Sequence, residues 1–167
     1  NYMSGNKGIS FAEDRLQIYR EVLEENGIPY DERRVYYGDF WELPTIDAMD
    51  KMFEDWDEMP EAIICANDIM AVTVCDCLKK RGYRVPEDVI VTGFDGIPSA
   101  RYCKPQLTTC SENLLALAKL SMDVLNKAID EKIPCKVLEN KYEPLFSESC
   151  GCKTLVGEDF RKDLAEL

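Results

Sequence analysis

The sequence predicts an α/β fold built on a parallel sheet, and three observations lead to this prediction. Short apolar runs rich in β-branched or aromatic residues alternate with stretches of helical periodicity, which is the pattern of βαβ units. The expected strand ends, near residues 5, 38, 66 and 93, are spaced by roughly one βα unit of about 30 residues. The 167 residues, of which 46% are hydrophobic, suffice for one domain, or a large part of one, with a hydrophobic core.

The first helix is expected to begin at Ser10. Ser10 and Glu13 have the spacing of a capping box, in which each side chain binds a backbone N–H near the other residue. Apolar residues at helical spacing follow, and Gly27 supplies the left-handed residue that ends many helices. Residues 1–5 resemble the end of a strand, so the sequence is expected to enter the fold partway.

The remaining elements follow the same alternation. The further expected strands are residues 34–37, 62–66, 89–92 and 136–142. One helix is expected beyond Pro44 and another after Asp68, ending at Gly82. A long helix is expected to open at Ser111, with one apolar face made by Leu114, Leu115, Ala118, Met122, Leu125 and Ile129. Residues 158–167 have helical spacing as well.

Charge and composition exclude several classes of function. The net charge is −12, and basic residues cluster only in the short runs 33–34 and 79–81, so direct binding of nucleic acid by this chain is not expected. No run approaches the length of about 18 apolar residues that a membrane span needs. Without histidine or a glycine-rich phosphate loop, no enzymatic activity and no cofactor are expected.

The eight cysteines indicate a reducing compartment. Disulfide frameworks belong mainly to small secreted domains with little core, whereas several of these cysteines fall in apolar runs such as 63–66. Cys150 and Cys152 form a C-x-C pair, which lacks the spacing of common zinc sites. A cytoplasmic protein without a metal site is therefore expected.

Ligands of open parallel sheets bind outside the carboxyl ends of the strands, where loops and helix N-termini meet. This rule selects side chains suited to a polyhydroxylated ligand, with an amide, carboxylates, a guanidinium group and aromatic rings. They are Arg15, Phe40, Trp41, Asn67, Asp68, Phe94 and Asp95.

Each candidate also has a structural interpretation. Asp68 is expected to be the N-cap of the following helix, and Asp95 with Gly96 forms a turn pair. Arg15 is a candidate for surface ion pairs with Glu13 or Asp14. The rings of Phe40 and Trp41 are candidates for the core.

Four ordered motifs of this sequence resemble the lactose-repressor/galactose-repressor (LacI/GalR) family. They are residues 63–71 (IICANDIMA), 78–89 (LKKRGYRVPEDV), 91–95 (VTGFD) and 105–109 (PQLTT). The resemblance covers residues 1–152 and implies the second half of an effector-binding domain with a type I periplasmic-binding-protein-like fold. Such a domain clamps its effector between two lobes, and the first lobe would lie mostly outside this chain.

The resemblance also implies site residues and partners. Arg15, Asn67 and Asp95 would bind effector hydroxyls, Phe40 would place its ring against the sugar, and Glu112 would reach the ligand from a hinge. The effector would be sugar-like or nucleoside-like, the protein would be a homodimer, and DNA would be bound only through a domain outside this chain. Residues 153–167 would be a helical tail or linker toward an output of helix-turn-helix, AraC-like or diguanylate cyclase type.

Two other classes remain as alternatives. A solute-binding protein of a sugar transport system has the same fold, although the scattered cysteines fit an oxidising periplasm poorly. A structural interaction domain with a vestigial cleft is the second alternative.

Overall fold

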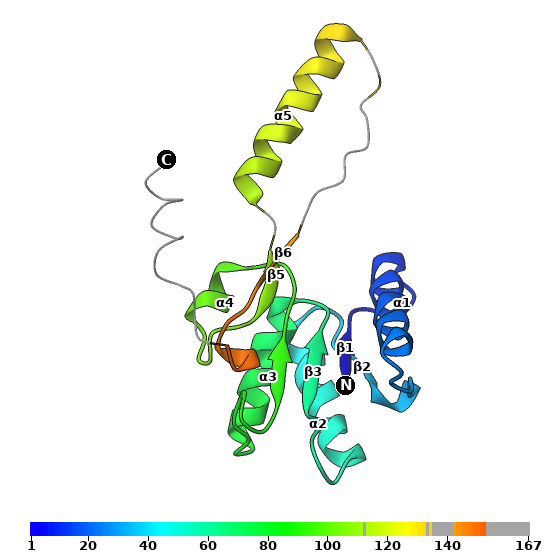
Figure 1. Cartoon of the computed structure of the whole chain (residues 1–167), viewed down its shortest axis with the longest axis vertical. Coiled ribbons are helices and arrows are strands. Elements are labelled where there is room, and N and C mark those ends of the chain that lie inside the picture. Colours follow the sequence, from blue (N-terminus) through cyan, green and yellow to red (C-terminus); the bar gives the residue numbers. More distant parts are fainter. Residues whose placement is uncertain (112, 133, 135–141, 153–167) are drawn as a thin grey trace.

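The computed structural model describes residues 1–111, 113–132, 134 and 142–152, and its centre is a parallel sheet of four strands (Figure 1). The strands are β1 (Tyr2–Ser4), β2 (Val35–Tyr37), β3 (Ala62–Cys65) and β4 (Ile90–Thr92), in the order β2-β1-β3-β4. In the register, Met3 lies opposite Tyr36 and Cys65, and Ile63 lies opposite Val91. The predicted α/β class with a parallel sheet is confirmed.

Three helices connect these strands and cover the sheet unequally. The helices are α1 (Ser10–Glu25), α2 (Glu42–Asp55) and α3 (Asp68–Lys80). Helices α2 and α3 pack side by side on one face. Helix α1 lies on the opposite face, where Tyr19 stacks on Tyr2 of β1 with ring centroids 4.8 Å apart.

The core lies between the sheet and the pair α2 and α3. Ile63 and Val91 point into it and have no exposed surface. Their neighbours Ile64 and Ile90 point to the opposite face, where they are 42% and 37% exposed, because successive side chains of a strand alternate between faces. Methionines fill much of the core, and Met3, Met49, Met52 and Met70 are completely buried.

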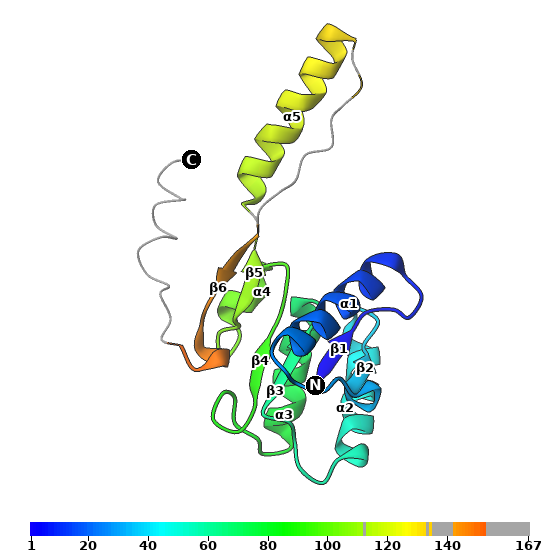
Figure 2. The same cartoon turned by 45° about the vertical axis from the view of Figure 1, so that its right-hand side comes forward.

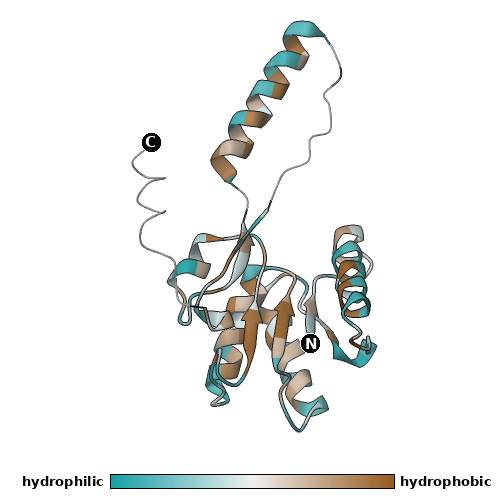
Figure 3. Ribbon diagram, in the orientation of Figure 1, coloured by the Kyte–Doolittle hydropathy of each residue, from teal (hydrophilic) through white to brown (hydrophobic). Residues whose placement is uncertain are grey.

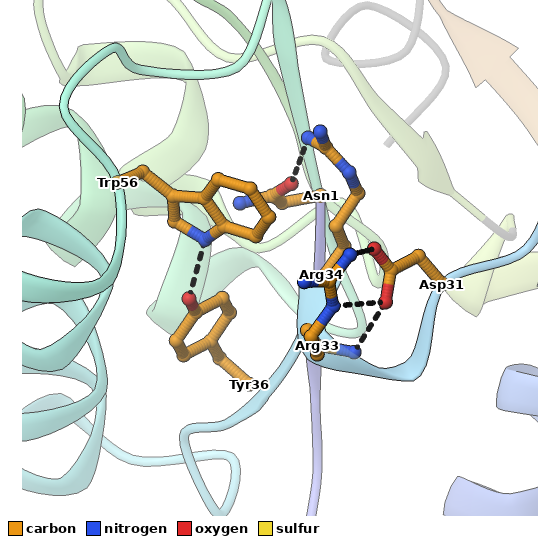
Figure 4. Close-up of polar contacts among 6 residues, drawn as sticks. All are labelled: Asn1, Asp31, Arg33, Arg34, Tyr36 and Trp56. Atoms are coloured by element: carbon orange, nitrogen blue, oxygen red, sulfur yellow. Dashed lines mark hydrogen bonds and ion pairs between the residues drawn. The ribbon is translucent and has the colours of Figure 1, made fainter.

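A polar cluster fastens the amino ends of the first two strands (Figure 4). The indole N–H of Trp56 donates to the hydroxyl of Tyr36 at 2.7 Å. The guanidinium of Arg34 lies 4.4 Å from the Trp56 ring centroid and also donates to the side-chain oxygen of Asn1 at 3.3 Å. These contacts hold the start of β1 against β2 and the end of α2.

The chain then leaves the sheet and returns to it. After β4 come the short helix α4 (Pro98–Tyr102) and β5 (Thr109–Ser111), which pairs antiparallel with β6 (Glu143–Leu145). Between β5 and β6 the helix α5 (Leu114–Glu131) projects away from the body (Figure 1). A 3₁₀ turn, Glu148–Cys150, follows β6. Its Ser149 hydroxyl donates to the Val91 carbonyl at 2.6 Å, so the returning chain is fixed to β4.

Two helix starts differ from the sequence prediction. Ile9 is the N-cap of α1 and has no capping side chain, because Ser10 is already helical and Glu13 instead accepts from the backbone N–H of Gly8 at 3.0 Å. Ser111 belongs to β5, and α5 is capped by Asn113, whose side chain accepts from the N–H of Ala116.

Two predicted segments lie outside the described residues. Of the predicted strand at 136–142, only Tyr142 is among the described residues. The described strand that follows it is β6 (Glu143–Leu145). The predicted tail at 153–167 lies entirely outside them. None of the described helices combines the length and apolar composition that crossing a bilayer requires.

Candidate functional site

The carboxyl edge of the sheet carries the predicted site residues, and the loop after β2 is shaped to bring Phe40 there. Asp39 and Phe40 have positive φ angles of 52° and 65°, which turn the chain back over the end of β1. The Phe40 ring then lies above Gly5, where an added Cβ would be 1.9 Å from a ring carbon. The ring of Phe11 stacks on the Phe40 ring with centroids 5.2 Å apart. Phe40 is therefore held in place by packing, and glycine at position 5 makes room for it.

Asn67 connects this loop to α3. Its side-chain oxygen accepts from the N–H of Met70 at 2.9 Å, which makes it the N-cap of α3. Its amide nitrogen donates to the carbonyl of Phe40 at 3.2 Å. The expectation that Asp68 caps α3 is wrong, because the cap is the preceding residue and Asp68 is the first helical residue.

Asp68 holds the loop that follows β4. Its side chain is fully buried, and its carboxylate accepts from the N–H of Ile97 at 2.9 Å and from the hydroxyl of Thr109 at 2.6 Å. Its own N–H donates to the carbonyl of Phe94 at 2.8 Å. Burial raises the pKa of Asp68, and these hydrogen bonds oppose the rise. Asp68 is thus a positioning residue for the loop 94–97.

Arg15 reaches the same edge from α1. Its guanidinium lies over the Phe94 ring, 4.4 Å from the centroid, and donates to the carbonyl of Ala66. A surface ion pair with Glu13 or Asp14 is not among the ion pairs of the described residues. Stacking and the backbone bond together fix the direction of the guanidinium fork.

Asp95 sits in a strained turn between β4 and β5. Its φ is 118°, and its N–H donates to the carbonyl of Cys110 at 2.9 Å. The next residue, Gly96, has a φ of 69°, and a Cβ there would lie 2.3 Å from the hydroxyl of Ser111. Non-glycine residues with positive φ are costly and often mark functional loops, and Asp39, Phe40 and Asp95 are all at this edge.

The structure therefore brings Arg15, Phe40, Asn67 and Asp95 to one edge, as the sequence predicts. Trp41 is 66% exposed, which excludes the alternative that its ring belongs to the core. Glu112 lies outside the described residues. Sequence reasoning missed the positioning roles of Thr109 and Asp68, which depend on a contact across 41 residues.

An apolar groove of about 430 Å³ borders this edge. Arg15 and Phe94 line it together with other residues of α1, β3 and β4 and with Pro144 and Phe146. Phe40, Asn67 and Asp95 do not line it. The groove and the cluster of predicted site residues are thus neighbours that share Arg15.

The cysteines of the described part of the chain are all free thiols. Cys65 and Cys75 are buried, and burial raises the pKa of the Cys75 thiol to about 12. Among the described residues no group of cysteine and acidic side chains is arranged to hold a metal ion.

Comparison with known proteins identifies one family. The model of the periplasmic binding protein-like domain matches residues 2–150. The chain is 32% identical over 130 residues to the HTH-type transcriptional repressor PurR of Vibrio atlanticus, covering 78% of this chain and 39% of that protein. It is 32% identical over 143 residues to the HTH-type transcriptional regulator GalR of Escherichia coli, and this match covers 86% of this chain and 41% of that protein.

Solved structures agree with this match. The structure of the transcriptional regulator CelR–cellobiose complex superposes with a TM-score of 0.79 at 29% identity, covering 89% of this chain and 45% of that one. A LacI-type transcription regulator from Bifidobacterium animalis superposes with a TM-score of 0.74 at 33% identity, covering 81% and 49%. The chain thus spans less than half the length of these relatives.

Proposed function

We propose a function from one established premise: the chain belongs to the periplasmic binding protein-like domain family, in the form found in LacI/GalR-type transcriptional regulators. The chain is proposed to be one lobe of an effector sensor. It binds a small polyhydroxylated molecule, carries out no catalysis, and controls an output domain that lies elsewhere in the longer protein.

The observation that carries this proposal is the convergence of four side chains at one sheet edge. Arg15 presents a guanidinium fixed by Phe94 and Ala66, and Asn67 presents an amide fixed by the α3 backbone. Phe40 adds a ring locked between Gly5 and Phe11. Asp95 adds a carboxylate on a turn whose backbone is bound to Cys110. Donors, acceptors and an apolar ring in fixed positions are what sugar recognition requires.

The two-lobe arrangement of the proposal is supported by α5. The apolar stripe predicted for this helix has no partner among the described residues: Leu114 is 68% and Ile129 64% exposed, as the brown bands on α5 in Figure 3 illustrate. An amphipathic helix normally buries such a stripe. We infer that α5 packs in the first lobe of the longer protein, and that β5 and β6 are hinge strands.

The remaining features of the proposal follow from the family. The protein acts as a homodimer in the cytoplasm, and DNA is contacted through a domain outside this chain, since the net charge of −12 disfavours phosphate binding here. The relatives named above are regulators, which favours this function over a transport protein. The cellobiose of the CelR complex makes saccharides the first class of effector to test.

The experiment is ligand-induced thermal stabilisation of the full-length protein with galactose, cellobiose, lactose and ribose. A ligand at 100 times its Kd stabilises a protein by about 2.7 kcal/mol. Arg15→Ala removes charged donors, each contributing about 1.5–3 kcal/mol, and is expected to abolish the shift while the protein stays folded.

Arg20→Ala is the matched control, because Arg20 is on the same helix but stacks on Tyr30 at 4.7 Å. It should keep the full shift. A ligand that stabilises wild type and Arg15→Ala equally would refute the site, and failure of all four saccharides with wild type would refute the saccharide class.

A further inference from the structure

The C-x-C pair of Cys150 and Cys152 can be reached from solvent and lies outside the candidate effector site. Cys152 is exposed and Cys150 is partly buried, whereas Cys65, Cys75 and Cys77 are buried. Buried structural cysteines are inert, and a thiol that reacts must be at least partly exposed. Each thiol of this pair is accessible and has a second thiol two positions away.

The turn that carries the pair is fixed to the body of the domain. Figure 2 shows this turn in orange, at the end of β6 and beside β4. The Ser149 hydroxyl donates to the carbonyl of Val91 at 2.6 Å and accepts from the N–H of Thr108 at 2.8 Å. The thiol of Cys150 donates to the carbonyl of Ser147 at 3.2 Å. These contacts hold the Cys150 side chain and the backbone before it in one position.

Gly151 bends the chain between the two cysteines. Its φ is 84°, in the left-handed region that favours glycine, and its N–H donates to the carbonyl of Glu148 at 2.9 Å. A fully extended chain separates the Cα atoms of residues two apart by about 7 Å, whereas a disulfide needs about 4.4–6.8 Å. The bend shortens the separation toward this range, and the side chains of Cys150 and Cys152 interact with each other.

The two thiols differ in how firmly they hold a proton. Burial by itself would raise the pKa of Cys150, but hydrogen bonds with Thr108, Cys152 and the backbone outweigh burial and lower this pKa. The pKa of Cys152 is raised, chiefly by its hydrogen bond with Cys150. Burial raises the pKa of the partly buried thiols of Cys103 and Cys110. Because the thiolate is the nucleophile, Cys150 is suited to attack and Cys152 to resolve.

We propose that Cys150 and Cys152 form a redox-active dithiol, which disulfides of small thiols such as glutathione disulfide oxidise to an internal disulfide. The Cys150 thiolate attacks one sulfur of the small disulfide, and one small thiol leaves with the proton that Cys150 gave up. Cys152 then attacks the Cys150 sulfur of the mixed disulfide, and the second small thiol leaves with the proton of Cys152. Two electrons pass to the small disulfide. Disulfides in a reducing compartment are usually transient and redox-sensing, as this pair would be.

Peptide mass spectrometry of the full-length protein tests the proposal. The folded protein is equilibrated without oxygen in mixtures of reduced and oxidised glutathione that contain a chelator, and the remaining thiols are then blocked with N-ethylmaleimide in denaturant. Trypsin releases residues 142–153, whose cysteines are Cys150 and Cys152, and residues 102–119, whose cysteines are Cys103 and Cys110. As oxidised glutathione increases, residues 142–153 should acquire an internal disulfide while residues 102–119 are still fully blocked.

Two results would overturn the proposal. One is that residues 142–153 stay reduced until residues 102–119 are oxidised as well. The other is that Cys150 and Cys152 each carry glutathione and form no internal disulfide at any mixture. The measurements omit the effector, so they succeed or fail independently of the Arg15 experiment.

Three variants examine the separate steps. Cys152→Ser removes the resolving thiol, so glutathione should stay attached to Cys150. Gly151→Ala keeps both thiols but places a Cβ on a left-handed backbone, so closure of the internal disulfide should slow severalfold and the mixed disulfide should accumulate. Gly82→Ala is the matched control, because Gly82 follows α3 and has a φ of 85°; closure should be as fast as in wild type. Equally fast closure in Gly151→Ala would show that the turn does not build the site and would refute the proposal.

Discussion

Replacing Asp68 tests how the candidate site is assembled. The fully buried carboxylate accepts hydrogen bonds from the N–H of Ile97 and the hydroxyl of Thr109. Asp68→Ala leaves both donors without this acceptor, and each such loss costs about 1–3 kcal/mol. The substitution also removes the cost of burying a carboxylate, which is the cause of the raised pKa of Asp68, and this gain offsets part of the loss from the two hydrogen bonds. The free energy of unfolding should therefore fall by about 2–4 kcal/mol.

Urea unfolding followed by circular dichroism measures this change. Asp68→Asn keeps one acceptor and should cost less than Asp68→Ala. Asp76→Ala is the matched control, because Asp76 is exposed on the same helix and should change stability by less than about 0.5 kcal/mol. Thr109→Val removes the orphaned hydroxyl, so the double variant with Asp68→Ala should lose less than the sum of the single variants. Equal stability of Asp68→Ala and Asp76→Ala would refute the positioning role.

Two other perturbations have defined outcomes. Ser149→Ala should cost about 1–3 kcal/mol in urea unfolding, because a buried hydroxyl that bridges the returning chain to β4 is lost. Gly5→Ala should displace the Phe40 ring and reduce saccharide-induced thermal shifts. Gly27→Ala meets no atom within 4 Å but strains a left-handed backbone with a φ of 68°, so it should lower the unfolding temperature without ligand and keep the saccharide-induced shifts.

The sequence by itself determined the class of the fold and the edge of the sheet at which the candidate site residues lie. Alternation of apolar runs with helical periods depends on neighbouring residues, so it predicts parallel βα units without knowledge of distant contacts. The rule that loops after parallel strands converge then selected Arg15, Phe40, Asn67 and Asp95, together with Trp41, Asp68 and Phe94. Four motifs identified the family for the same reason, because each is a local stretch such as residues 91–95.

The tertiary structure decided which residue plays which part within that edge. Both Asn67 and Asp68 suit an N-cap, and the choice between them depends on Thr109 and Ile97, which approach only when β5 lies beside β4. The direction of Arg15 was likewise set by Phe94, which is 79 positions away in the sequence. The apolar pattern of Ile64 and of α5 predicts buried faces. The tertiary structure shows instead that Ile64 and the apolar residues of α5 are exposed, because no described part of the chain packs against them.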